Sequence, residues 1–182
     1  MKRSLLLSLL DNYVPMTEEE TATQQRVIEF VREQENCFER SLEIGHITGS
    51  AWLLNKEGSH ALLMHHTKLD RWFQLGGHCD GESNVLAVAL KEAQEESGIS
   101  DIAAVSFEIF DIDVHTIPEH KDIKAHEHYD IRFLLQAQSD ELVVQNKESK
   151  ELRWIAKTSK LTDLPTQEAS VLRMFEKWVE GN

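Results

Sequence analysis

Residues 76–99 read GGHCDGESNVLAVALKEAQEESGI, and this stretch carries the strongest structural signal in the chain. Its second half predicts a helix in which Glu92, Glu95 and Glu96 stand at i, i+3 and i+4. At 3.6 residues per turn the three carboxylates project within one narrow sector, where they repel one another unless a cation lies among them. The sequence therefore predicts a helix with an acidic, cation-binding face.

The same segment carries the signals that would anchor and bound this helix. Asn84 is a favourable N-cap, and Gly98 stands where a left-handed C-terminal residue is wanted. A separate apolar stripe at helical spacing consists of Leu86, Ala89, Leu90 and Ala93. We expect this stripe to pack against a sheet, which leaves the carboxylates on another side of the helix.

Length and composition limit the class of protein. The 182 residues are 41% hydrophobic and 28% charged, enough for one well-filled core with an appendage. A net charge of −13 argues against a nucleic-acid backbone as a partner, whereas a small phosphorylated substrate remains compatible if divalent metal ions supply positive charge. Cys37 and Cys79 show no CxxC spacing, so a reducing, cytoplasmic setting is expected.

The N-terminal segment has some features of a targeting signal. Lys2 and Arg3 precede a leucine-rich run like that of a secretory signal, but Ser8 interrupts the run and Asp11 ends it without a cleavage pattern. A short amphipathic helix is the better interpretation. No apolar run reaches the 18 residues of a membrane span, so no membrane association is expected.

A second helix is predicted directly afterwards. Thr17 and Glu20 have the spacing of a capping box, and Val27 and Val31 follow at helical spacing. Residues 1–44 therefore form a predicted N-terminal helical extension. It could cover the core of its own domain or that of a second copy, which leaves a homo-oligomer open.

Strand patterns begin after this extension and predict an α/β domain over residues 45–182. A turn-forming cluster at residues 55–59 separates the first two apolar segments, which indicates a hairpin, and a helix follows Pro165. Phe110, Ile112 and Val114 are expected on one side of their strand. The predicted strands are Ile47–Leu54, Ala61–Met64, Trp72–Leu75, Phe107–Val114, Tyr129–Leu135 and Glu151–Ile155.

The run from Gly77 to Ile99 resembles the Nudix box of MutT-like hydrolases, G-x5-E-x7-R-E-U-x-E-E-x-G-U with U an aliphatic residue. Two positions depart from it: Ser83 stands at the first Glu, with Glu82 one residue earlier, and Lys91 stands at the Arg. Lys keeps the charge of Arg but not its planar hydrogen-bonding fork. The residues in register are Gly77, Glu92, Glu95, Glu96, Gly98 and Ile99, with Ala93 at an aliphatic position.

The resemblance implies a Nudix-type α/β/α sandwich with a mixed β-sheet. It also implies a hydrolase that cleaves a diphosphate linkage in a nucleoside diphosphate-X substrate by water attack on phosphorus, with Mg²⁺ or Mn²⁺ as cofactor. Glu92 and Glu96 would be the principal ligands and Glu95 a further one, with the carbonyl group of Gly76 or Gly77 completing the shell. Whether Glu92 acts as ligand or as base stays open.

Residues outside the box complete the predicted site. Family members often add a carboxylate from elsewhere; the candidates are Glu82, Glu127 and Asp130, with Glu148 and Glu151 also considered. A solvated loop is the competing interpretation of the segment that contains Glu127. His126 and His128 could bind a transition metal, but two histidines at i and i+2 are a weak signal. The predicted substrate contacts are Arg71, Trp72, Lys91 and Arg132, with core packing as the alternative for Trp72.

Two other functions are compatible with the pattern. The first is a Nudix-fold binding or regulatory domain with weak or no turnover, which Ser83 and Lys91 favour. The second is an enzyme similar to isopentenyl-diphosphate isomerase, which would require a catalytic cysteine such as Cys79. Phosphate release from a nucleotide panel would separate these functions from the hydrolase.

Overall fold

The computed structural model of the protein describes residues 2–119, 123–140 and 142–181. Its helices are α1 Ser4–Asn12, α2 Glu18–Glu33, α3 Val85–Ser97 and α4 Ala169–Glu180, with a 3₁₀ turn at Leu161–Asp163. Its strands are β1 Gly45–Leu54, β2 His60–His66, β3 Trp72–Phe73, β4 Leu75–His78, β5 Ile102–Ala104, β6 Asp111–Ile117, β7 His126–Ala137 and β8 Ser149–Ala156.

One mixed sheet contains these strands. β1 and β7 pair in parallel along the length of β1, from Gly45↔Glu127 to Leu54↔Gln136, and the other described pairs are antiparallel. The path runs β3-β2-β1-β7-β5, while β4 pairs with β1, β6 with β7 and β8 with β2. The predicted hairpin of β1 and β2 and the strands at β7 and β8 are confirmed.

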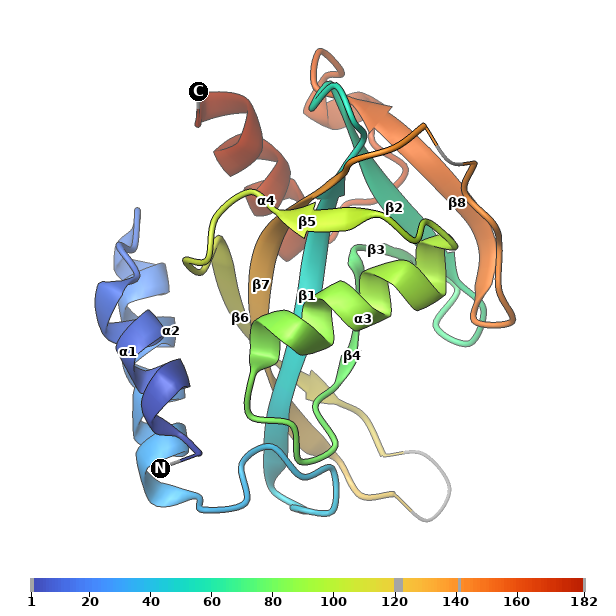
Figure 1. The fold of residues 1–182 in the computed structure, drawn as a ribbon. Helices are drawn as coiled ribbons and strands as arrows, with labels where there is room; N and C mark the ends of the chain where they lie inside the picture. The colour runs from blue at the N-terminus through green and yellow to red at the C-terminus, as the bar shows by residue number, and fades with distance from the viewer. Residues whose placement is uncertain (1, 120–122, 141, 182) are drawn as a thin grey trace.

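Helices cover both faces of the sheet (Figure 1). Along β1 the side chains alternate: Ile47, Ala51 and Leu53 belong to a core shared with α1, α2 and α3, whereas Trp52 and Leu54 belong to a second core shared with α4. Two cores on opposite faces of a mixed sheet define an α/β/α sandwich. The predicted fold class is confirmed.

Helix α3 begins and ends where its sequence predicts. Asn84 Oδ1 accepts a hydrogen bond from the N–H of Ala87 at 3.2 Å, and Gly98 adopts the left-handed conformation at φ 74°. Ala89 and Ala93 are fully buried against the sheet. Because both side chains are small, α3 approaches the sheet closely and holds its acidic face near β4.

The N-terminal extension is joined to its own domain. Thr17 Oγ1 caps α2 by accepting from the N–H of Glu20 at 3.1 Å, while the Glu20 carboxylate accepts from Tyr13 Oη at 2.8 Å and pairs with Lys177 Nζ of α4 at 2.9 Å. Phe30 of α2 stacks on Tyr129 of β7 with ring centroids 3.8 Å apart. Within this chain the extension therefore covers its own core.

One predicted strand was wrong in its extent. β6 begins at Asp111 rather than Phe107, and Phe107 is 76% exposed. Phe110 precedes the strand and packs in the α4-side core, whereas Ile112 packs in the opposite core, so the two do not share a face. The predicted strand begins too early because the backbone bends at Phe107 and Glu108, and its pairing with β7 starts only at the Phe110 N–H, which donates to the Arg132 carbonyl group at 2.8 Å. Strand β5 was missed because it is only three residues long.

Among the described residues, none of the helices combines the length and apolarity that crossing a membrane requires.

Candidate functional site

The three box carboxylates lie where β4 meets α3. Glu96 is only 3% exposed, and its Oε2 accepts a hydrogen bond from the Gly76 N–H at 2.8 Å. A Cβ atom at Gly77 would lie 2.6 Å from Cδ of Glu92, so only glycine leaves room for the Glu92 carboxylate at this distance. Gly76 and Gly77 of β4 therefore contact the carboxylates of Glu96 and Glu92 on α3.

Lys91 offsets part of the negative charge. Its Nζ lies 3.3 Å from Glu92 Oε1 and 3.4 Å from Glu95 Oε2, so one ammonium group bridges two of the carboxylates. Burial and the charge of Glu95 raise the pKa of Glu92, although Lys91 opposes this shift. Burial, followed by the charges of Glu92, Glu148 and Glu95, raises the pKa of Glu96 to about 8.

These oxygen donors fit a divalent cation. Mg²⁺ and Mn²⁺ prefer oxygen ligands, and here three carboxylates share one helix, with Glu96 almost fully buried. Lys91 reaches Glu92 and Glu95, whereas the backbone N–H of Gly76 donates to Glu96.

A carboxylate from outside the box acts electrostatically on this site. The charge of Glu148 contributes to the raised pKa values of both Glu92 and Glu96. Its segment is docked on the C-terminal end of α3, because the Val144 N–H donates to the Ser97 carbonyl group at 2.7 Å and Asn146 Nδ2 donates to the Glu95 carbonyl group at 3.3 Å. Glu148 carries no sequence motif, and only the path of this segment brings it to the site.

The three carboxylates singled out from the sequence lie in other environments. Glu82 accepts a hydrogen bond from the N–H of Asn84 at 2.8 Å, at the entry to α3. The Glu127 carboxylate accepts from Thr116 Oγ1 at 2.7 Å and pairs with Arg26 of α2 at 3.2 Å. Asp130 is buried and accepts hydrogen bonds from Thr48, Ser50, Gln74 and Arg132.

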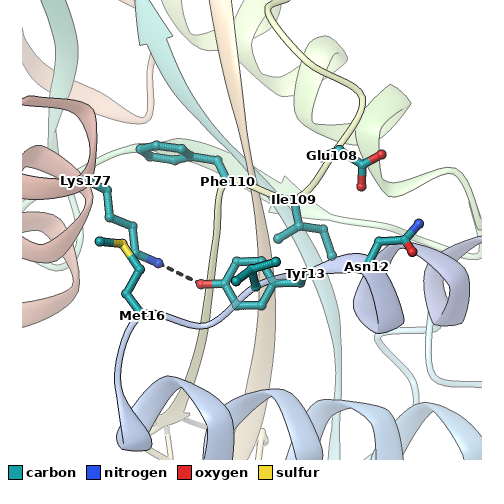
Figure 2. Close-up of a pocket in the computed structure, with 8 residues that line it drawn as sticks. Asn12, Tyr13, Met16, Glu108, Ile109, Phe110 and Lys177 are labelled. Atoms are coloured by element: carbon teal, nitrogen blue, oxygen red, sulfur yellow. Dashed lines mark hydrogen bonds between the residues drawn. The ribbon is translucent and has the colours of Figure 1, made fainter. Parts of the chain in front are cut away.

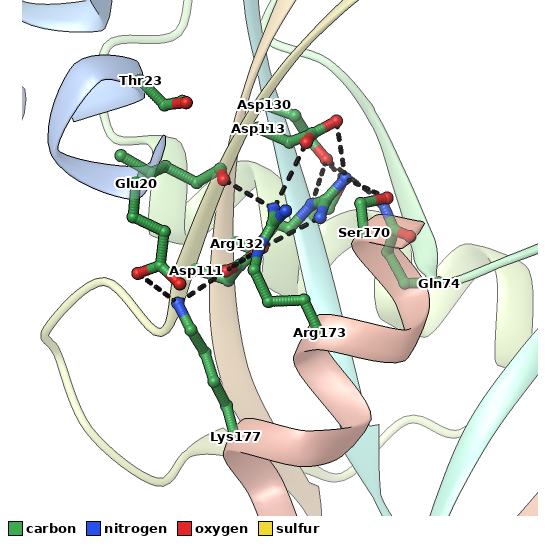
Figure 3. Close-up of polar contacts among 12 residues, drawn as sticks. Glu20, Thr23, Gln74, Asp111, Asp113, Asp130, Arg132, Ser170, Arg173 and Lys177 are labelled. Atoms are coloured by element: carbon green, nitrogen blue, oxygen red, sulfur yellow. Dashed lines mark hydrogen bonds and ion pairs between the residues drawn. The ribbon is translucent and has the colours of Figure 1, made fainter. Parts of the chain in front are cut away.

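Asp130 belongs to a buried ionic network that links β6, β7 and α4 (Figure 3). Arg132, with a side chain 2% exposed, pairs with Asp130 at 2.7 Å, Asp111 at 2.9 Å and Asp113 at 3.3 Å. Arg173 of α4 also pairs with Asp111 at 2.9 Å. Arg132 is therefore the counter-ion of buried carboxylates. The sequence pattern around Arg132 does not indicate that its side chain is buried.

The other predicted substrate contacts are held by the protein itself. Arg71 Nη1 pairs with Glu168 Oε1 at 2.9 Å on the surface. Trp72 is buried, His65 stacks on it with ring centroids 5.0 Å apart, and the Arg153 guanidinium lies 4.6 Å from its ring centroid. Core packing therefore accounts for the position of Trp72.

A pocket of about 380 Å³ lies between the α1–α2 connection, the turn before β6 and α4 (Figure 2). Its lining includes Tyr13, Ile109, Phe110 and Lys177, and the Lys177 ammonium group donates to Tyr13 Oη at 2.6 Å. None of its lining residues belongs to the acidic box. The pocket is a gap between the extension and the domain, remote in the structure from the carboxylates of α3.

Comparison with known proteins identifies the family. Residues 46–175 match the family model described as NUDIX domain. Since this match covers more than half of the chain, the protein belongs to the Nudix family. The predicted family, the fold class and the Nudix-type hydrolase class are confirmed. A comparison with curated protein sequences gives no match.

Solved structures share the fold at low sequence identity. A Nudix-family hydrolase from Clostridium perfringens is 23% identical with a TM-score of 0.55, covering 73% of this chain and 95% of that one. The E. coli dihydroneopterin triphosphate pyrophosphohydrolase is 13% identical with a TM-score of 0.56, covering 75% and 96%. A C. elegans Ap4A hydrolase is 16% identical with a TM-score of 0.53, covering 72% and 93%.

Proposed function

We propose that this protein is a Mg²⁺- or Mn²⁺-dependent hydrolase that cleaves a diphosphate linkage in a nucleoside diphosphate-X type of substrate by water attack on phosphorus. The observation that carries the proposal is the spacing of Glu92, Glu95 and Glu96 on helix α3, with Glu96 buried and accepting a hydrogen bond from the Gly76 N–H at 2.8 Å. When bound there, a divalent ion supplies the positive charge that a diphosphate and its leaving phosphate require.

In this proposal Glu92 and Glu96 are the main ligands, and Glu95 is a further ligand or a contact through water. Glu92 also has the placement for a general base, since its carboxylate faces Gly77 and its pKa is raised by burial. Glu148 supplies the carboxylate from outside the box, which its electrostatic effect on Glu92 and Glu96 supports. Lys91 orients Glu92 and Glu95, the task of the arginine in the family pattern.

The substrate class follows from charge and from the fold. The net charge of −13 disfavours a polyanionic nucleic-acid backbone, so a small nucleotide derivative bound through metal is proposed. Structural neighbours are described as acting on Ap4A, ADP-ribose or dihydroneopterin triphosphate, which makes these compounds the first substrates to assay. Cys37 and Cys79 are free thiols, consistent with a reducing cytoplasmic setting.

No observation favours an isomerase. Cys79 is 4% exposed, and burial raises the pKa of its thiol far above the ordinary range. A thiol in this environment is a poor nucleophile and a poor acid. The binding-domain alternative keeps the support of Ser83 and Lys91.

The test is product release from these compounds with Mg²⁺ or Mn²⁺, comparing the wild-type protein with Glu96→Gln. The amide keeps an oxygen to accept from Gly76 but removes the charge, so we expect kcat/KM to fall by at least about tenfold while the fold is kept. Glu151→Gln, an exposed carboxylate paired with Arg153, is the matched control and should retain activity. Ligand binding without turnover by the wild-type protein would favour the binding domain instead.

A further inference from the structure

Five histidines gather on the sheet face that points away from α3. His46 of β1 is in register with His128 of β7, and His128 is in register with His115 of β6. His126 lies two residues before His128 on the same face, and His78 of β4 pairs with Thr48, two residues from His46. Four strands therefore bring imidazole rings together from distant parts of the sequence.

The rings are close enough to share one ion. The ring centroids of His46, His78 and His128 lie 4.8 to 5.1 Å apart, and a nitrogen from each lies within 4.8 Å of one from each other ring. A tetrahedral ion with Zn–N bonds of about 2.0–2.1 Å holds nitrogens roughly 3.4 Å apart. Small rotations of the three rings would close the remaining gap.

The central ring is buried without partners. His46 is 3% exposed, and neither of its ring nitrogens has a hydrogen-bond partner among the described residues; Nε2 of His128 is buried in the same state. The Leu42 carbonyl group favours the protonated form of His46, but it forms no hydrogen bond with either nitrogen of the ring. The neutral imidazole is the form that ligates metal. Unpaired buried nitrogens cost free energy, which a bound ion would recover.

The neighbouring rings are already oriented by outer partners. Nδ1 of His115 lies 3.0 Å from Asp113 Oδ2, and Nδ1 of His126 lies 2.9 Å from the Lys124 carbonyl group. Such contacts fix the tautomer and turn Nε2 toward a metal in known sites. A pocket of about 180 Å³ that includes Arg40, Leu42 and His126 in its lining lies beside this cluster.

We infer that His46, His78 and His128 form a binding site for a zinc-class divalent transition-metal ion, with His126 or a water molecule as the fourth ligand. Nitrogen ligands favour Zn²⁺ or Co²⁺ over Mg²⁺. The ligands of the site differ from those of the acidic box, because Gly77 faces Glu92 while the next residue, His78, points to the opposite face of β4, although the charge of Glu148 acts on His78 as well as on Glu92 and Glu96. It therefore does not depend on the proposed hydrolase activity.

The test uses the full chain freed of metal with a chelator. Co²⁺ titration should give the visible absorption bands of a tetrahedral site, saturating at one equivalent and reversed by Zn²⁺, and the Zn²⁺ dissociation constant is measured by competition with a chelating dye. His128→Gln should weaken Zn²⁺ binding by more than about 100-fold, because changes in the outer shell alone cost 10–100-fold. His66→Gln, outside the cluster on β2, is the matched control and should bind like wild type.

Three results would overturn the site. The first is wild-type protein that takes up no stoichiometric Zn²⁺ or Co²⁺. The second is unchanged affinity in His128→Gln, checked for folding by circular dichroism; His78→Gln removes a partly exposed ring and repeats the measurement if His128→Gln does not fold. The third is loss of Zn²⁺ binding in Glu96→Gln, which would assign the ion to the box. Turnover is not part of this readout, so failure of the proposed hydrolase would leave the result interpretable.

Discussion

Gly77 and Gly49 are register partners on β4 and β1. Substitution by alanine should lower activity at Gly77 and stability at Gly49. A Cβ atom at Gly77 would lie 2.6 Å from Cδ of Glu92, whereas at Gly49 it would lie 2.8 Å from the backbone oxygen of Val85. The first obstacle is the end of a flexible side chain. The second is the backbone of α3, which cannot rotate away.

The expected magnitudes follow from these contacts. In Gly77→Ala the Glu92 carboxylate must withdraw by about 0.8 Å to reach ordinary contact at 3.4 Å. A misplacement on the order of 1 Å can cost about 100-fold in rate, so we expect kcat/KM to fall by about ten- to 100-fold. The free energy of unfolding should change by no more than about 1 kcal/mol, because alanine also reduces the freedom of the unfolded chain.

In Gly49→Ala the crowding falls on packed backbone, and we expect a loss of about 1–3 kcal/mol in unfolding free energy. For a chain of this length that corresponds to a fall in Tm of roughly 2–12 °C. Stability is measured by urea unfolding, and Mn²⁺ affinity by electron paramagnetic resonance, which needs no substrate. Gly77→Ala with wild-type Mn²⁺ affinity and turnover would refute the role given to Glu92. Equal destabilisation by both variants would refute the distinction between flexible and rigid neighbours.

Two further predictions concern the buried charges. Arg132→Met should lower the unfolding free energy by about 3–5 kcal/mol because it leaves buried carboxylates without their counter-ion. The control Arg71→Met changes a side chain that is 64% exposed and should cost no more than about 1 kcal/mol. Urea unfolding followed by tryptophan fluorescence compares the two variants. Burial alone would raise the pKa values of Glu20 and Asp111, but the cationic partners Lys177 and Arg132 lower both. The stabilisation that these ionised carboxylates give is present above their unfolded pKa values and is lost as pH falls through the lower folded values. The unfolding free energy should therefore fall below about pH 4. An unfolding free energy that stays constant from pH 5 to pH 2 would contradict the assignment.

Local signals account for the parts of the site that the sequence predicts correctly. Asn84 and Gly98 bound α3 through hydrogen bonds and dihedral angles that depend on neighbouring residues only. The spacing of Glu92, Glu95 and Glu96 on α3 is likewise a property of one helix. The hairpin of β1 and β2 is equally local, since a short turn-forming segment joins the two strands.

The rest of the site depends on contacts between distant segments. The charge of Glu148 acts on Glu92 and Glu96 because residues 144–148 dock on the end of α3, and Arg132 is buried among three aspartates from β6 and β7. Neither arrangement leaves a periodic pattern. In the sequence, His126 and His128 give only a weak metal signal, because the parallel pairing that adds His46 joins residues 82 positions apart.

The alternation of a single strand separates two kinds of chemistry. On β4, Gly77 has no side chain and admits the carboxylate of Glu92 from α3, while His78 on the opposite face joins the histidine cluster. Hard cations select the oxygen donors, and borderline transition metals select the nitrogen donors. The two groups of donor atoms therefore differ in the metal ions that they favour. Parallel titrations of Glu96→Gln and His128→Gln with Mn²⁺ and Zn²⁺ therefore assign each ion to its donor atoms.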